Sequence, residues 1–488
     1  MKYKQWIFIP ILQVCLFSLL EAQNQPILCS HCTCTPSTGS YVNADCSNNV
    51  SSVLYTTSKN TSDNTSAESN DLIQKLSVRK NELITLKDKF PFANLEVLDL
   101  SQNKIVHIED NVFSKLQKLQ TLILSKNNIE KLDPNAFQGE YAPEEFLPLR
   151  ALRTIMLDRN NLHSLNANLF EHTEKIESLS LAYNPLEVID QHTAIAITNL
   201  IHLKFLDLSY TQISVLPQYF LHTPRYITVL NMSGNNFVHV PMELEEAHAL
   251  ETFIFNDNPV VNLTHKNGFP EIPTLRVLHL CQMPELTEIG AGSLANLTKL
   301  EELYVAGNPK LARIDDGALA STDRTGGTYE VWPSIKKLYL NDNQLSYMNK
   351  SFLAQWDSLA ELDLLDNPWT CECENQWMVD TLMPIYMKID KEKAEDMKCG
   401  APVEMVSFTF HELFAKNYRM RCLDLYGARP EEDAVLMIGM LTGILIGIPI
   451  VLLCLYSYKR HWFGIFDDSP AAFSRQFYGR TGGDVYDY

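Results

Sequence analysis

The chain has 488 residues, with 40 lysine and arginine residues against 59 aspartate and glutamate residues, a formal net charge of −19 at pH 7. Nucleic acids and heparin-like polysaccharides are bound by proteins that present a basic field. The acidic balance disfavours both classes of ligand, and we expect no nucleic-acid partner.

The first segment, residues 1–22, predicts a secretory signal peptide. Lys2 and Lys4 precede an apolar run from Ile7 to Leu20, and Glu21-Ala22 follows. A basic start, an apolar middle and a small residue at the cut are typical of such signals, although the position of Leu20 usually holds a small residue. We therefore expect cleavage after Ala22 and export of the rest of the chain into an oxidising compartment.

Two groups of four cysteines predict disulfide-bonded caps at residues 23–46 and 367–422. The groups are Cys29, Cys32, Cys34 and Cys46, and Cys371, Cys373, Cys399 and Cys422. Even groups of cysteines in an exported chain indicate disulfides. A zinc site built on Cys29-Ser-His-Cys32 is the competing interpretation, which we disfavour because exported thiols oxidise. The residues of the first group leave its pairing open.

Residues 47–72 are mostly Ser, Thr and Asn and have almost nothing to bury, which predicts a mobile, glycosylated loop. Asn-x-Ser/Thr sequons mark candidate glycosylation sites within this loop and further along the chain. They lie at Asn49, Asn60, Asn64, Asn231, Asn262, Asn296 and Asn349. We expect some of these seven sites to carry glycans.

One phrase recurs twelve times between residues 73 and 366: a leucine-type residue, two variable residues, Leu, one variable, Leu, two variable, Asn, one variable, Leu. The copies open at Ile73, Leu95, Leu119, Leu152, Ile176, Leu203, Ile227, Leu250, Leu275, Leu300, Ile335 and Leu359. Leu-x-Leu alternates with the period of a strand. One strand cannot bury that leucine face alone, so the copies are expected to stack as a parallel sheet.

The recurring Asn is expected to be buried and to bond the backbone groups that lose strand partners where the chain turns. Thr211 replaces it in one copy and keeps a hydroxyl, whereas Met283 replaces it in another and offers no amide. The copies opening at Leu250 and Leu275 are therefore expected to be the least regular. Apolar rings on the far side of the core, Phe113, Phe137 and Phe170, predict an aromatic spine. Two long copies place surface loops at 139–148 and 321–333.

The variable strand positions are expected to form the concave face, where large apolar side chains have no core to enter. Two aromatic clusters are candidate partner-binding residues: Tyr183, Phe205 and Tyr210, and Tyr304 with Tyr339. Exposed aromatic clusters are typical of interfaces, although strands favour aromatic residues anyway. Tyr183 and Tyr210 occupy equivalent positions and are predicted to stack. A glycan at Asn231 would separate the two clusters.

Residues 434–458 predict a transmembrane helix, preceded by a short stalk at 423–433 and followed by a cytoplasmic tail at 459–488. Acidic residues precede the apolar run and basic residues follow it, which orients the N-terminus outside. Gly439, Gly443 and Gly447 share one helix face, a spacing that favours helix association and a possible homodimer. In the tail, phosphorylation is predicted at Tyr478, Tyr486 and Tyr488.

The repeats and the stretch Asn367-Pro-Trp-Thr-Cys-Glu-Cys373, with Trp377, Cys399-Gly-Ala-Pro402 and Cys422, resemble the extracellular leucine-rich repeat family. The resemblance covers about residues 29 to 422. It implies an α/β solenoid: a curved horseshoe with a parallel concave sheet, disulfide-stapled caps and one transmembrane helix, in a single-pass type I protein of the plasma membrane. It also implies the disulfide pairs Cys371 with Cys399 and Cys373 with Cys422.

No metal-ligand spacing, nucleophile elbow or phosphate loop occurs in the sequence, so we expect neither an enzyme nor a cofactor. The leading hypothesis is a cell-surface recognition protein, an adhesion molecule or co-receptor whose repeats bind another extracellular or cell-surface protein. The alternatives are an innate-immune accessory receptor that captures microbial ligands and a lateral regulator of another receptor. Since many unrelated receptors share this architecture, the fold alone does not choose among them.

Overall fold

The computed structural model describes residues 27–37, 40–48, 71–141, 146–322, 330–422 and 430–459. The predicted signal peptide, the sequons at Asn49, Asn60 and Asn64, and the tail tyrosines Tyr478, Tyr486 and Tyr488 lie outside these residues. The chain divides into two compact units, residues 1–418 and 419–488. The first holds the repeats and most of the caps, and the second holds the long C-terminal helix.

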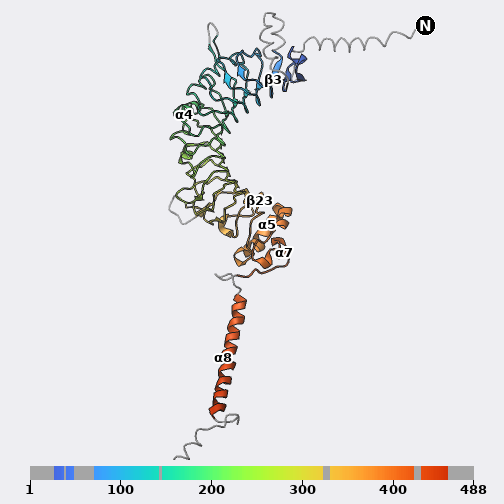
Figure 1. The fold of residues 1–488 in the computed structure, drawn as a ribbon, viewed down its shortest axis with the longest axis vertical. Helices are drawn as coiled ribbons and strands as arrows, with labels where there is room; N and C mark the ends of the chain where they lie inside the picture. Colours follow the sequence, from blue (N-terminus) through green and yellow to red (C-terminus); the bar gives the residue numbers. More distant parts are fainter. Residues whose placement is uncertain are drawn as a thin grey trace, which may run out of the picture. The chain divides into compact units, whose positions relative to one another are not determined.

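A fourteen-stranded sheet runs through the first unit, and its last twelve strands are all parallel. These twelve strands are β3 (Ile73–Ser77), β5 (Val97–Asp99), β7 (Thr121–Ile123), β10 (Thr154–Met156), β11 (Ser178–Ser180), β12 (Phe205–Asp207), β13 (Val229–Asn231), β14 (Thr252–Ile254), β16 (Val277–His279), β18 (Glu302–Tyr304), β22 (Lys337–Tyr339) and β23 (Glu361–Asp363). They lie along an arc and line its concave side (Figure 1). Each strand therefore belongs to one copy of the repeated phrase, as predicted.

The central leucine-type residue of each strand is buried and its two neighbours are half-buried in nearly every copy, because side chains alternate between the two faces of a sheet. Outside the main sheet, short strands pair as β4 (Thr85–Leu86) with β6 (His107–Ile108), and as β15 (Asn262–Leu263), β17 (Glu288–Ile289) and β19 (Arg313–Ile314). One α-helix, α4 (Gln191–Thr198), and the 3₁₀ helices η2 (Met242–Glu246) and η3 (Lys350–Phe352) complete the outer side. The predicted surface insertions form the two hairpins β8 (Glu140–Tyr141) with β9 (Phe146–Leu147), and β20 (Ser321–Thr322) with β21 (Glu330–Val331).

A row of stacked phenyl rings fills the core behind the first repeats. Phe113 stacks on Phe137 and Phe137 on Phe170, each pair with 6.1 Å between ring centroids. Phe90 extends the row, 5.9 Å from Phe113. The predicted aromatic spine is therefore present and begins one repeat earlier than predicted. Buried aromatic rings contribute large apolar areas, which makes this row a main source of packing energy in the first repeats.

The asparagine ladder is present and joins each repeat to the one before it. In the rung at Asn127, the side-chain Nδ2 donates to the carbonyls of Leu100 and Leu124 at 3.1 and 2.9 Å, and Oδ1 accepts from the Ile105 amide at 3.1 Å. Thr211 keeps part of this pattern because its hydroxyl donates to the Leu208 carbonyl at 2.8 Å. In a complete rung such as Asn127, one side chain thus satisfies three backbone groups that the hydrogen bonds of the sheet leave unpaired.

Met283 interrupts the ladder as predicted. Only its sulfur faces the amide of Asn258, at 3.5 Å, and among the described residues the buried Nδ2 of Asn308 in the next repeat has no hydrogen-bond partner. The strands of these repeats nevertheless pair in unbroken register, Phe253 with Leu278 and Leu278 with Leu303. The predicted irregularity is therefore confined to the side-chain ladder and does not reach the sheet.

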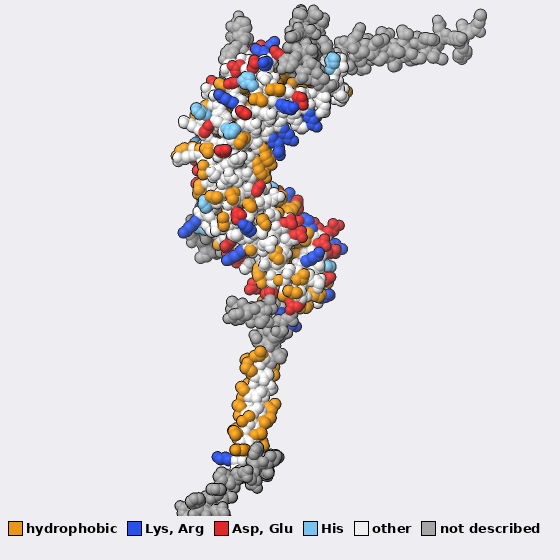
Figure 2. Space-filling model, viewed as in Figure 1, with side chains coloured by type: hydrophobic (Ala, Val, Ile, Leu, Met, Phe, Trp, Pro, Cys, Tyr) orange, Lys and Arg blue, Asp and Glu red, His pale blue; other side chains and the backbone are white. Residues whose placement is uncertain are grey.

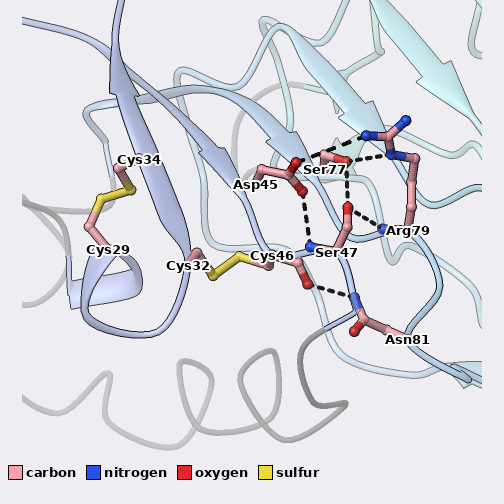
Figure 3. Close-up of a disulfide and its surroundings, with 9 residues drawn as sticks. All are labelled: Cys29, Cys32, Cys34, Asp45, Cys46, Ser47, Ser77, Arg79 and Asn81. Atoms are coloured by element: carbon pink, nitrogen blue, oxygen red, sulfur yellow. Dashed lines mark hydrogen bonds and ion pairs between the residues drawn. A yellow bond between two sulfur atoms is a disulfide. The ribbon is translucent and has the colours of Figure 1, made fainter.

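The N-terminal cap is a 3₁₀ turn, η1 (Ile27–Ser30), and a hairpin of β1 (Thr33–Pro36) and β2 (Val42–Asp45) that extends the sheet beside β3. Its disulfides join Cys29 to Cys34 and Cys32 to Cys46, which decides the pairing that the sequence left open (Figure 3). The carbonyl of Cys46 accepts a hydrogen bond from the Asn81 side chain at 2.8 Å, so the cap is bonded to the first rung of the ladder. These cysteines form disulfides and do not form the alternative zinc site.

The C-terminal cap packs against the last repeat through short helices: η4 (Cys373–Asn375), a π-helical turn η5 (Met378–Leu382), α5 (Met383–Ile389), α6 (Lys391–Asp396), η6 (Val403–Met405) and α7 (Phe410–Ala415). Trp369 and Tyr386 are fully buried, and the Trp369 indole donates to the Leu364 carbonyl at 2.8 Å. Cys371 is bonded to Cys399, the pair that the family resemblance implied. Cys373 and Cys422 each form a disulfide bond.

The second unit contains α8 (Pro430–Lys459), a thirty-residue helix. Its part from Leu436 to Lys459 is 24 residues long and apolar enough to cross a membrane, and it is the only such helix in the described parts of the chain. Hydrophobic side chains follow the helix along its visible face (Figure 2). Gly443 and Gly447 line a shallow groove on it with Met440 and Ile444, and apart from the neighbouring residues and the backbone of the helix itself no described atom lies within 4 Å of where a Cβ would stand on either glycine.

Candidate binding surfaces

The sheet register brings three aromatic side chains together on the concave face. His279, Tyr304 and Tyr339 are the last residues of β16, β18 and β22 and pair directly across these strands. The imidazole of His279 stacks on Tyr304 at 4.3 Å and 1°, and Tyr304 stacks on Tyr339 at 4.9 Å and 17°. We call these three residues the C-terminal aromatic column. The structure therefore brings the predicted pair Tyr304 and Tyr339 together and adds His279.

Charged groups beside the C-terminal aromatic column fix the orientation of its rings. The hydroxyl of Tyr304 donates to Glu302 at 2.8 Å, and that of Tyr339 donates to Glu361. Lys337 lies between these two carboxylates, 3.5 Å from Glu302 and 3.3 Å from Glu361. The rings are therefore held in place before any partner arrives, which lowers the entropy lost on binding.

Lys393 of the C-terminal cap closes one end of this column. Its Nζ lies 2.6 Å from the carboxylate of Asp363 in β23 and 5.6 Å from the centre of the Tyr339 ring. An ammonium group near a ring face is attracted by the π electrons. The cap therefore contributes a side chain to the surface, a contribution that the repeat pattern did not indicate.

The electrostatics of the column keep its rings neutral near pH 7. The hydrogen bond to Glu361 raises the pKa of Tyr339 to about 12, and burial acts in the same direction. Burial, followed by the hydrogen bond to Glu302, raises the pKa of Tyr304 above its ordinary value. Burial also lowers the pKa of His279, against an opposing effect of Glu302. The column is therefore a row of uncharged rings between charged neighbours.

The second predicted cluster divides between two places. Phe205 lies in β12, half-buried on the sheet, whereas Tyr183 and Tyr210 follow their strands and adopt left-handed backbone angles, both with φ of 55°. The two tyrosine rings stack at 4.4 Å and 10°, as predicted. The guanidinium of Arg159 lies 3.9 Å from the centre of the Tyr183 ring, on the adjacent repeat.

Tyr183 and Tyr210 belong to a row at the edge of the sheet, which we call the edge column. It consists of the residue seven places after each repeat start: Lys80, Gln102, Lys126, Arg159, Tyr183, Tyr210, Gly234, Asp257, Gln282, Gly307, Asp342 and Asp366. All twelve have positive φ, between 53° and 71°. The edge column was not identified from the sequence, although the fixed spacing would have revealed it.

Four predicted glycosylation sites fall in described parts of the chain. Asn262 and Asn349 are exposed. Asn296 is also exposed, and its Nδ2 donates to the Phe269 carbonyl at 2.9 Å. Asn231 ends β13 on the concave face, and its Oδ1 accepts hydrogen bonds from the amide and hydroxyl of Ser233 at 3.1 and 2.8 Å. A glycan at Asn231 would therefore stand on the sheet two repeats before His279.

Comparison with known proteins agrees with this architecture. A family model described as leucine rich repeat matches residues 71–129, 93–140 and 150–204. Toll-like receptor 9 of Mus musculus is 25% identical over 362 residues, which are 67% of this chain and 32% of that protein. CD180 antigen of Mus musculus is 23% identical over 329 residues, 64% of this chain and 48% of that protein. The chain thus matches less than half of the length of either relative.

Among solved structures, a chain of the octameric complex of latrophilin 3, Unc5D and the leucine-rich repeats of FLRT2 superposes with a TM-score of 0.51 and 20% identity. The alignment covers 68% of this chain and 92% of that chain. This similarity concerns the fold alone. Residues 71–140 and 150–204 therefore match the leucine-rich repeat family, and the twelve stacked strands between disulfide-bonded caps give the described repeats the fold of a leucine-rich repeat solenoid.

Proposed function

We propose that this protein is a non-enzymatic cell-surface recognition protein, an adhesion molecule or co-receptor that binds another protein through the C-terminal aromatic column. The observation that carries the proposal is the stack of His279, Tyr304 and Tyr339, whose side chains are half-buried on the concave sheet. Tyrosines that are held in one conformation are effective interface residues because they bury a large area with little loss of entropy. Nearby carboxylates and lysines supply a polar rim.

Placement at the plasma membrane, with the N-terminus outside, is part of the proposal. The disulfides of both caps support an oxidising compartment for the repeats. The acidic residues Glu431, Glu432 and Asp433 at the start of α8 and the basic residues Lys459 and Arg460 at its end support a cytoplasmic C-terminus. The Cys373–Cys422 bond, glycans at Asn262 and Asn349, and phosphorylation of the tail tyrosines remain predictions of this placement.

The proposal is tested with the full chain displayed on non-adherent cells and screened against cell-surface proteins. Replacing Tyr304→Ser and Tyr339→Ser together should weaken binding of the partner by about a hundredfold, the loss of two interface hot spots. Tyr219→Ser with Tyr226→Ser is the matched control, since both tyrosines are exposed and lie outside the strands. Equal affinity of the two double variants would refute the use of the C-terminal aromatic column.

A second candidate is an innate-immune accessory receptor, supported by the similarity to Toll-like receptor 9 and CD180 antigen over 67% and 64% of this chain. The same cells separate the two candidates when they are offered purified microbial glycolipids beside the panel of surface proteins. Capture of glycolipid with no protein partner would favour the accessory receptor and contradict adhesion. Capture of a protein from the same cell, and not from facing cells, would instead favour lateral regulation of another receptor.

Pairing of two chains through α8 remains a proposal as well. Gly439, Gly443 and Gly447 leave an open strip along the helix, which lets two backbones approach closely. Gly443→Leu should reduce pairing in a membrane association assay, whereas Leu453→Ile, which keeps the volume of its side chain and lies outside the groove, should not. Unchanged pairing of the Gly443→Leu variant would remove the glycine strip from the proposal.

A further inference from the structure

The edge column is segregated by charge along its length. Its charged members before Tyr183 are all basic, and its charged members after Tyr210 are all acidic. All twelve positions of the edge column lie in described parts of the chain. The basic members are Lys80, Lys126 and Arg159, and the acidic members are Asp257, Asp342 and Asp366. Tyr183 and Tyr210 lie between the two halves, in the fifth and sixth of twelve repeats.

A continuous row of backbone hydrogen bonds fixes the spacing of these charges. The amides of the ten edge residues from Gln102 to Asp342 each donate to a carbonyl of the next repeat: for example Lys126 to Asp158 at 2.9 Å, Arg159 to Ala182 at 2.8 Å, and Asp342 to Leu365 at 3.1 Å. Neighbouring strands in a sheet lie about 4.8 Å apart, so the edge residues follow one another at roughly this interval. A surface ordered in this way loses little backbone entropy on docking.

The outer charges of the edge column are available to a partner. Lys80, Lys126, Asp342 and Asp366 are all exposed, and no ion pair is recorded for any of them within the described residues. Their neighbours are already paired. Arg79 lies 3.9 Å from Asp45 and 3.7 Å from Asp99, and Lys104 lies 3.0 Å from Glu82. The two ends of the column therefore keep opposite charges that the fold does not neutralise.

We propose that the edge column binds a second copy of this chain in antiparallel orientation. A two-fold axis places the same surface of each copy against the other, so the basic half of each copy meets the acidic half of its partner. With the axis beside Tyr210, Lys80 of one copy lies opposite Asp342 of the other, and Arg159 lies opposite Asp257. A parallel arrangement would set like charges against each other, which is unfavourable.

The curvature of the repeats permits this arrangement. The edge column follows an arc. A two-fold axis along the radius through the middle of this arc turns the arc onto itself with its ends exchanged. The curved edges of the two copies can therefore stay in contact along their whole length. The C-terminal caps then lie at opposite ends of the pair. Two copies anchored in facing membranes could pair in this way. That consequence rests on the proposed cell-surface function, but the pairing of opposite charges does not depend on it.

A charge-swap experiment tests the inference with full-length chains, carrying two different tags and solubilised in detergent. Lys80→Glu with Lys126→Glu leaves Arg159 as the only basic member of the edge column, and Asp342→Lys with Asp366→Lys leaves Asp257 as its only acidic member. Each double variant should lose self-capture by about tenfold or more, because like charges then face each other. Mixing the two variants should restore capture to the wild-type level, since the new acidic group at position 80 of one variant then faces the new basic group at position 342 of the other.

Matched controls separate the edge from net charge and from misfolding. Lys115→Glu with Lys175→Glu changes the net charge equally at exposed positions outside the edge column and should leave self-capture unchanged. Wild-type self-capture should also fall in roughly 1 M NaCl, where the Debye length is about 3 Å. The milder pair Lys80→Gln and Asp342→Asn serves if a charge reversal unfolds the chain, and each should lower self-capture in part.

Two results would overturn the inference: absence of self-capture by the wild-type chain at low salt, or failure of the two folded double variants to capture each other. Capture of a different protein by the edge, with no self-capture, would also contradict the second copy as its partner. The proposed function is tested separately, because the charge-swap variants retain Tyr304 and Tyr339. Conversely, the Tyr304→Ser and Tyr339→Ser chain keeps every charge of the edge column, so its loss of partner binding would not change the interpretation of the charge-swap experiment.

Discussion

The ring of Tyr210 lies directly over Gly234 of the next repeat, and a Cβ atom on Gly234 would meet ring carbons at 2.2 Å. Gly234 also has a φ of 65°, a conformation that side chains with a Cβ adopt at a cost. Gly307 occupies the equivalent position three repeats later with a φ of 71°, but its nearest contact is Gln282 Cγ at 3.5 Å. The two glycines therefore share a backbone conformation and differ in what covers them.

Gly234→Ala should destabilise the repeats more than Gly307→Ala does. Both substitutions cost about 1 kcal/mol of backbone strain, and only Gly234→Ala also has to displace the Tyr210 ring, a further cost of about 1 to 3 kcal/mol. Denaturant unfolding of the purified chain, followed by circular dichroism, measures the difference. Equal losses in the two variants would show that the ring moves aside freely.

Asn160→Leu should destabilise the solenoid by about 3 kcal/mol, because it leaves several buried backbone groups unpaired. The Asn160 side chain bonds the Leu124 and Leu157 carbonyls at 3.0 and 2.9 Å and the Ile129 amide at 3.1 Å. Thr211→Val is the control for a rung with fewer bonds, with an expected loss of about 1 kcal/mol. Unfolding midpoints that fail to separate these two variants would argue against the ladder as a main source of stability.

The free energy of unfolding should fall as the pH drops below the pKa of His279 in the unfolded chain. Burial lowers the pKa of this imidazole in the folded chain, so the unfolded chain takes up the proton more readily. The contribution of His279 is therefore complete above its unfolded pKa of about 6.5 and is lost progressively as the pH falls toward the folded value.

His279→Phe should remove this part of the pH dependence and keep a ring against Tyr304. Unfolding midpoints at a series of pH values from neutral to acidic provide the measurement. His222→Phe, at an exposed site outside the strands, controls for the added phenyl ring. A slope with pH that His279→Phe leaves unchanged would assign the acid sensitivity to other groups.

Removing the Cys371–Cys399 bond should loosen the C-terminal cap. The bond joins residues 28 apart in sequence. A loop of this length corresponds to about 3 to 4 kcal/mol of stabilisation in the chain-entropy model. Cys371→Ala with Cys399→Ala should therefore make the cap susceptible to limited proteolysis under native conditions. Cys281→Ser, at the half-buried free cysteine in the repeats, should leave the cleavage pattern unchanged.

Positions that recur at a fixed spacing could be predicted from the sequence. The leucines, the asparagine ladder and its break at Met283 follow from a repeat that places equivalent residues in equivalent environments. Stacking of Tyr183 on Tyr210, and of Tyr304 beside Tyr339, follows for the same reason. The apolar run that forms α8 could be predicted from its length and composition alone, since crossing a membrane needs little else.

The tertiary structure decided what has no counterpart in the repeat. The cap pairs Cys29 with Cys34, which four closely spaced cysteines could not specify because several pairings have similar loop lengths. Lys393 comes from a cap helix to Tyr339 and Asp363, a contact that depends on how the helices pack. The left-handed turn after each strand moves Tyr183 and Tyr210 from the sheet to its edge. The charged side chains of the edge column are far apart in the sequence and become neighbours only because the repeats stack. Together they form one surface with a basic half and an acidic half.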